Sequence, residues 1–241
     1  MLWSEEAIVL AVRRHGETSA IVEALTRGRG RSLGLVRGGR SRALRPVLQP
    51  GNSVIATWRA RLEDHLGLFT VEMTSPRAAQ LMDDPFKLAG LTTVTALAQL
   101  LPEREPHPRI YDATKVLLDR LEDDAIWPAL LARWELGLLD ELGFGLDLAR
   151  CAATGSNEAL AYVSPKTGRA VGAEAGEPYR DRLLKLPQFL SEAKGIPDRS
   201  DVVDGLKLTG YFLERHILGP RGLPSPGARQ SVLERLARDN P

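Results

Sequence analysis

Cysteine is nearly absent from this chain, which has Cys151 as its one thiol in 241 residues. A single cysteine excludes an intramolecular disulfide and a zinc site built from several thiolates. This favours a reducing compartment, so we expect a cytoplasmic protein. The N-terminal residues Met-Leu-Trp-Ser-Glu-Glu are acidic where a signal peptide is basic, which argues against secretion.

Long hydrophobic runs are also missing. The longest mostly apolar run, Leu88 to Leu101, contains three threonines and a glutamine. A membrane-spanning helix needs about 20 apolar residues, so we expect no membrane association. The overall hydrophobic and charged fractions, 43% and 26%, are instead those of an ordinary globular protein.

The common catalytic motifs do not occur. Glycine is never followed by lysine, which excludes a phosphate-binding P-loop, and there is no Gly-x-Ser-x-Gly or His-Glu-x-x-His. The acid pairs Asp83-Asp84 and Asp123-Asp124 lie where helices are expected to begin, so we interpret them as helix-start acids and not as metal ligands. We therefore expect a non-enzymatic protein. An unrecognised hydrolase or nuclease is the weaker alternative.

Lysine is absent from the first 75 residues, although they contain 11 arginines and have a net charge of +4. The remaining residues have a net charge of −3, so the charge is divided between two parts of the chain. Seven arginines occur within residues 27–45, which contain no acid and also contain five glycines. Arginine suits phosphate binding, and glycine allows a backbone to approach closely.

This arginine run predicts a nucleic-acid site. Two arginines of a later strand extend it, and the predicted DNA-binding residues are Arg27, Arg29, Arg31, Arg37, Arg40, Arg42, Arg45, Arg59 and Arg61. The alternative is a solvated basic surface, because arginine outnumbers lysine 26 to 6 throughout. Few aromatic residues are available for stacking (Trp3, Trp58 and Phe69), and phosphate contacts carry little sequence information.

The hydrophobic periodicity predicts five strands followed by helices. Strands are expected at 8–12, 20–26, 31–37, 54–62 and 66–73, and a short helix at 41–48, which is the pattern of an OB barrel. Helices are expected at 86–101, 109–121, 127–142, 181–190, 202–217 and 228–236. The fold class is α+β and multidomain, with an OB-type barrel at 1–76, a mostly α-helical domain at 77–241, and an irregular region at about 147–178.

Several landmarks occur in an order that resembles the RecO family of bacterial recombination mediators. The N-terminal ones are Val9 to Glu17, Thr26 to Arg31 and Val36 to Arg42, which leads to Leu48-Gln-Pro50. The others are Trp134-Glu-Leu-Gly-Leu-Leu-Asp-Glu-Leu-Gly143, then Cys151, then Tyr162-Val-Ser-Pro-Lys-Thr-Gly168. The resemblance covers nearly the whole chain.

The resemblance implies binding of single- and double-stranded DNA and annealing of complementary strands. Its implied partners are RecR, the C-terminal tail of single-strand-binding protein (SSB) and, indirectly, RecA. It also implies a bacterial monomer that is associated with the nucleoid when bound to DNA. An acidic tail needs a basic residue beside an apolar pocket, so Arg133 and Trp134 are candidate contacts. The alternative function is an OB-fold RNA-binding module of translation or RNA metabolism.

The chain departs from the family at its zinc site. Many members have four cysteine ligands, but here Cys151 matches the first, Thr154 stands at the second, and residues 172–175 contain no cysteine. We therefore expect no zinc and no other cofactor. The irregular region at about 147–178 is therefore a degenerate, zinc-free insertion in the helical domain. Its residues 151–175 must be held by packing or be mobile.

Overall fold

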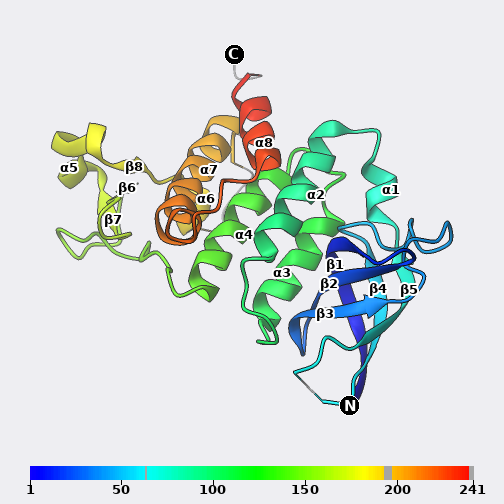
Figure 1. Ribbon diagram of the computed structural model, residues 1–241. Coiled ribbons are helices and arrows are strands. Elements are labelled where there is room, and N and C mark those ends of the chain that lie inside the picture. The colour runs from blue at the N-terminus through cyan, green and yellow to red at the C-terminus, as the bar shows by residue number, and fades with distance from the viewer. Residues whose placement is uncertain (63, 193–196, 239–241) are drawn as a thin grey trace. The chain divides into compact units, whose positions relative to one another are not determined.

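Residues 1–62, 64–192 and 197–238 are described in the computed structural model of this chain (Figure 1). The chain forms two compact units, Met1–Glu122 and Asp123–Pro241. The first contains a closed barrel and helices, and the second contains helices and a small sheet, so the fold is α+β as the sequence predicts. Among the described helices, none has the length and apolar content to cross a membrane.

The barrel has five strands in the order β1-β2-β3-β5-β4, which is an OB-type barrel. Their bounds are β1 Leu2–His15, β2 Ser19–Thr26, β3 Gly30–Val36, β4 Ser53–Arg59 and β5 Leu68–Ser75. All neighbouring strands are antiparallel except β3 and β5, which pair in parallel at one position, Leu35 with Leu68. This one short pairing is the weakest seam of the barrel.

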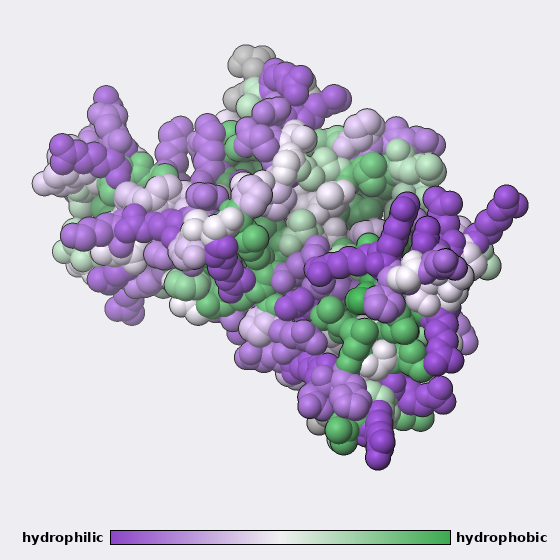
Figure 2. Space-filling model, in the orientation of Figure 1, coloured by the Kyte–Doolittle hydropathy of each residue, from purple (hydrophilic) through white to green (hydrophobic). Residues whose placement is uncertain are grey.

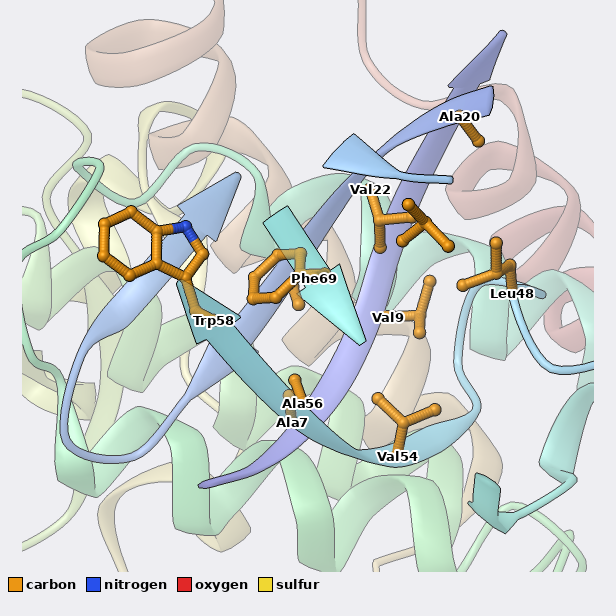
Figure 3. Packing of buried hydrophobic residues seen from close by; sticks show 11 residues of the cluster. Ala7, Val9, Ala20, Val22, Leu48, Val54, Ala56, Trp58 and Phe69 are labelled. Atoms are coloured by element: carbon orange, nitrogen blue, oxygen red, sulfur yellow. The ribbon is translucent and has the colours of Figure 1, made fainter. Parts of the chain in front are cut away.

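Alternating apolar residues fill the barrel (Figure 3). Val54, Ala56 and Trp58 of β4 all point inward and are buried, as their alternation predicts. The expected extension of this pattern to Leu62 is wrong, because β4 ends at Arg59 and the Leu62 side chain is exposed. The Trp58 ring nitrogen donates to the carbonyl oxygens of Leu33 and Leu66 at 3.3 and 3.1 Å. Trp58 is therefore a core residue and offers no stacking surface.

The helix expected at 41–48 is a series of hydrogen-bonded turns. Two bonds have α-helical spacing, from the Arg45 N–H to the Ser41 carbonyl and from the Leu48 N–H to the Leu44 carbonyl. Pro46 lies between them and has no N–H to donate, which interrupts the series of helical hydrogen bonds. The connection nevertheless holds Leu48 in the barrel core.

Three helices complete the described part of the first unit: α1 Arg77–Leu81, α2 Pro85–Ala98 and α3 Pro108–Asp119. The Asp84 side chain accepts hydrogen bonds from the N–H groups of Phe86 and Lys87, which caps α2. Desolvation by itself would raise the pKa of Asp84, but the two hydrogen bonds and the charge of Lys87 outweigh it, so the pKa is lowered. The interpretation of this acid as a helix-start residue is confirmed.

The second unit is built around α4 Trp127–Glu141, α7 Arg199–Leu213 and α8 Gly227–Arg238. Buried Glu135 of α4 accepts hydrogen bonds from the Arg229 guanidinium at 2.7 and 2.8 Å and another from the Thr209 hydroxyl. The ion pair thus joins α4 to α8, and the Thr209 hydrogen bond joins α7 to the same carboxylate. Gly143 follows the C-cap residue of α4 and has a φ of +84°, the left-handed conformation in which a glycine commonly ends a helix.

The rest of the second unit consists of shorter helices and strands. They are β6 Leu160–Val163, β7 Ala170–Gly172, α5 Ala173–Gly176, η1 Glu177–Arg182, β8 Leu184–Lys185, α6 Gln188–Ser191, η2 Glu214–Leu218 and η3 Gly219–Arg221. Strands β7, β6 and β8 form a sheet in that order. The helix expected at 181–190 is wrong, because this stretch contains a 3-10 turn, strand β8 and one turn of helix. Pro187 precedes that turn and disfavours helical backbone at Leu186.

Candidate nucleic-acid interface

The β2–β3 turn carries the first part of the arginine run, and its arginines contact acids of the same compact unit. Arg27 forms a forked ion pair with Asp112 of α3, with a shortest N–O distance of 3.0 Å. This hydrogen bond raises the Arg27 pKa. Arg29 lies 3.8 Å from Glu5, whose carboxylate also accepts a 2.9 Å hydrogen bond from the Gly28 N–H.

Arg31 is the most enclosed arginine of the run. Its guanidinium lies 2.6 Å from the Glu23 carboxylate and donates to the Leu101 carbonyl at 2.7 Å. The Glu23 side chain is 4% exposed, so this pair neutralises a buried charge. Arg13 approaches the same carboxylate at 3.6 Å. The outer surface of β2 and β3, where OB barrels commonly bind ligands, is therefore occupied here by an internal ion-pair network.

The sequence suggested that the glycines of the run let the backbone approach a ligand. In the structure, two of them instead let the chain pack closely against itself. Gly30 has a φ of +63°, and a Cβ there would lie 1.8 Å from the Glu105 carbonyl oxygen. A Cβ on Gly34 would lie 2.3 Å from the Phe69 ring. Both positions require glycine because the chain itself approaches closely.

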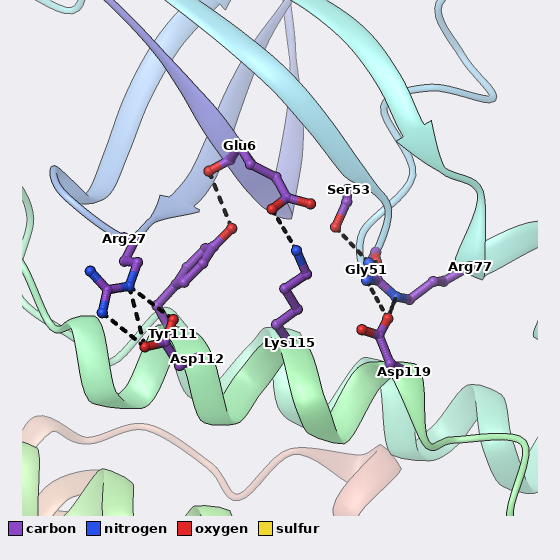
Figure 4. Close-up of polar contacts among 9 residues, drawn as sticks. All are labelled: Glu6, Arg27, Gly51, Ser53, Arg77, Tyr111, Asp112, Lys115 and Asp119. Atoms are coloured by element: carbon purple, nitrogen blue, oxygen red, sulfur yellow. Dashed lines mark hydrogen bonds and ion pairs between the residues drawn. The ribbon is translucent and has the colours of Figure 1, made fainter.

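The contacts of Arg27 belong to a longer polar seam between α3 and the barrel (Figure 4). Lys115 pairs with Glu6 at 2.6 Å, and buried Arg77 pairs with Asp119 at 2.6 Å. The Tyr111 hydroxyl donates to the Glu6 carbonyl at 3.3 Å, and burial raises the Tyr111 pKa. Arg27 is thus one of several side chains that fasten α3 to the barrel.

The second part of the run surrounds an open hollow at the opposite end of β2 and β3. The hollow has a volume of about 390 Å³, and Arg14, Arg40, Arg45 and Gln49 line it. Arg42 and Arg45 line a shallower neighbouring hollow. None of the described residues lining the two hollows is acidic. We call these four arginines, Arg14, Arg40, Arg42 and Arg45, the rim cluster.

The rim cluster keeps its charge available to solvent. Arg14, Arg42 and Arg45 are exposed and have no acidic partner within the described part of the chain. Arg40 donates to the carbonyl oxygens of Gly16 and Glu17 at 3.1 and 2.6 Å, which holds the 37–50 connection against the β1–β2 turn. Hydrophilic side chains project from this part of the barrel in Figure 2. Sequence reasoning missed Arg14, although its place beside the β1–β2 turn was a usable signal.

A separate groove lies along the seam between β3 and β5. Arg37 and Arg59 line it and are exposed, whereas Arg61 lies beyond the end of β4 and lines neither hollow nor groove. The groove has a volume of about 340 Å³, and its other lining residues are apolar or neutral. The nine predicted arginines therefore do not form one cluster.

The other predicted contact site lies in the second unit. Arg133 donates to the carbonyl oxygens of Phe189 and Glu192, and its guanidinium lies over the Phe189 ring at 5.9 Å. Trp134 is 3% exposed and belongs to the core. The Trp134 ring is therefore not available for a contact at the surface.

The degenerate zinc region is held by packing and backbone hydrogen bonds. Cys151 is buried, and its Sγ accepts a 3.2 Å hydrogen bond from the Gly172 N–H. Hydrogen bonds from the Thr154 hydroxyl and from Gly172 lower the Cys151 pKa to about 7. The described residues contain no group of three or more His, Cys, Asp or Glu that could hold a metal ion.

Comparison with known proteins identifies the family. Residues 1–77 match the family model "Recombination protein O N terminal", and residues 82–224 match "Recombination protein O C terminal". The DNA repair protein RecO of Methylobacterium nodulans is 58% identical, with 95% of this chain and 96% of the relative covered. The RecO proteins of Rhizobium etli and Sinorhizobium medicae are 54% and 52% identical, with 97% of this chain and 92% and 94% of the relatives covered. The chain therefore belongs to the RecO family of DNA repair and recombination proteins.

Proposed function

We propose that this chain is a recombination mediator that binds single- and double-stranded DNA and anneals complementary strands. With RecR, it helps to load RecA onto single-stranded DNA coated with SSB. The rim cluster carries the proposal, because its guanidinium groups have no acidic partner among the described residues. Family membership gives the biological setting, which is DNA repair.

Phosphate binding by the rim cluster has a simple physical basis. Each arginine presents several donors to a phosphate and displaces condensed counterions from the strand. An arginine that already has a carboxylate partner contributes less binding free energy to a DNA contact, because that partner must first be released. The exposed rim arginines therefore bind DNA more favourably than the arginines of the β2–β3 turn.

In the proposed role, the two parts of the chain bind different partners. The barrel domain, residues 1–76, supplies the DNA contacts, and the helical domain, residues 77–241, supplies the partner contacts. Arg133 would meet the acidic SSB tail. We propose a monomer that acts in the cytoplasm, on the nucleoid when bound to DNA, by binding and without a catalytic step.

Annealing of two complementary, SSB-coated oligonucleotides tests the proposal. Wild type should anneal them rapidly, and Arg42→Ala/Arg45→Ala should lose most of the activity. The matched control is Arg27→Ala/Arg29→Ala, which removes the same charge from the β2–β3 turn and should anneal like wild type.

Three outcomes count against parts of this account. Equal loss in both double variants would place the site across the whole arginine run. Failure of wild type to anneal would favour the RNA-binding alternative. Cleavage of the DNA in the presence of Mg²⁺ would show that the protein is an enzyme.

A further inference from the structure

We propose that the groove between β3 and β5 holds an unstacked nucleobase of a single strand, with flanking phosphates on Arg37 and Arg59. This inference rests on the proposed function, since it names the part of DNA that a second site on the barrel recognises. It would give the protein a preference for single strands over duplexes.

The groove exists because β3 and β5 separate soon after they meet. They pair only at Leu35 and Leu68, next to a 3.0 Å hydrogen bond from the Leu35 N–H to the Gly67 carbonyl. Strand β3 then ends at Val36, and the chain turns away into the 37–50 connection. Val36 pairs with Ala20 of β2, and its carbonyl accepts a hydrogen bond from the Gly39 N–H. Past Leu68, the edge of β5 that faces β3 has no strand partner among the described residues, so it can hydrogen-bond to a base edge.

The lining suits a flat, partly apolar group. Leu35, Leu44 and Leu68 provide aliphatic surface, and Thr57 and Thr70, which are cross-strand partners, add two hydroxyl groups. The volume of about 340 Å³ lies within the ~300–1,000 Å³ range of small-molecule sites. Aliphatic contact takes the place of aromatic stacking here, because Trp58 and Phe69 are only 4% exposed.

The charge at the groove selects nucleic acid over an extended peptide. Arg37 and Arg59 are exposed and face no acid among the described lining residues. Arg37 is also three residues from Arg40, so their Cα atoms are at most about 11 Å apart. A strand that leaves the groove can therefore reach the rim cluster directly. A duplex cannot use the groove in this way, because its bases are paired and stacked.

The test compares three probes of about 20 nucleotides at one salt concentration: oligo-dT, an abasic strand of equal charge, and a duplex. Wild type should bind oligo-dT about tenfold more tightly than the abasic strand. Thr57→Leu/Thr70→Leu fills the groove and should reduce this ratio towards one, with the affinity for the abasic strand unchanged. Unchanged abasic binding also shows that the variant is folded.

The control is Thr74→Leu, which replaces another exposed threonine of β5 with leucine outside the groove lining. It should keep the wild-type ratio. A wild-type ratio of one, or a full ratio in the groove-filled variant, would overturn the inference and leave phosphate binding by the rim cluster intact. Failure of wild type to bind any probe would instead overturn the proposed function.

Discussion

The two parts of the arginine run differ in a way that their sequences do not show. Residues 27–31 and 37–45 are both rich in arginine and glycine and free of acids. In the structure, Arg27, Arg29 and Arg31 contact Asp112, Glu5 and Glu23, respectively. Arg42 and Arg45 have no such partner in the described part of the chain. Availability for DNA thus depends on acids that are distant in sequence.

The comparison also separates two uses of arginine. In the β2–β3 turn, arginine neutralises carboxylates and joins the barrel to the helices behind it. In the rim cluster it surrounds an open hollow and keeps its charge. If arginine has these two uses, variants of the turn and of the rim cluster should differ in stability and in DNA binding.

Removing Arg31 should destabilise the fold far more than removing Arg42. Among the described residues, Arg31→Ala leaves exposed Arg13 as the remaining cationic partner of the buried Glu23 carboxylate, which should lower the free energy of unfolding by about 2–3 kcal/mol. Arg42→Ala should change it by less than about 0.5 kcal/mol. Urea unfolding measures both values. Equal small losses would mean that the Arg31 contacts are not structural.

The rim double variant should change the salt dependence of DNA binding. If about five arginines engage phosphates, wild type should show a log–log slope near −3.5 and lose affinity ~100-fold between 50 and 200 mM salt. Arg42→Ala/Arg45→Ala should make the slope shallower by about 1.4. Titration with a labelled single strand measures the slope, and Arg27→Ala/Arg29→Ala is the control. A flat wild-type profile would contradict this mode of binding.

Giving the rim cluster an acid should make it resemble the β2–β3 turn. Gln49 lines both hollows beside Arg45, and its side chain donates to the Arg45 carbonyl at 2.8 Å. Gln49→Glu should therefore weaken single-strand binding about fivefold, because Arg45 gains an internal partner. Gln49→Ala, measured by the same titration, controls for loss of the amide. Equal effects of the two variants would argue against the electrostatic explanation.

The reverse change should free an arginine of the turn. Asp112→Asn removes the partner of Arg27 and should tighten DNA binding about twofold, a small effect because the ion pair is exposed to solvent and therefore weak. Asp119→Asn alters another α3 acid, but its partner Arg77 is buried and cannot reach DNA. Direct titration distinguishes the two variants. Equal tightening would indicate a general charge effect and no specific release of Arg27.

Regular periodicity was the most reliable guide to the fold. The inward alternation of Val54, Ala56 and Trp58 was visible in the sequence, because one face of each strand must be buried. Errors occurred where a local pattern met proline or the end of a strand, as at Pro46, Pro187 and Leu62. Propensity and alternation do not report where a backbone hydrogen-bond ladder stops.

The candidate site was also only partly predictable from the sequence. The sequence by itself determined a basic N-terminal barrel, a helical second part and membership of a recognisable family, because these depend on composition, periodicity and ordered landmarks. Only the tertiary structure decided which arginines remain available, brought Arg14 into the rim cluster and opened the groove between β3 and β5. The physical reason is that ion pairs and strand seams are formed by residues that are distant in sequence, and no local pattern specifies those partners.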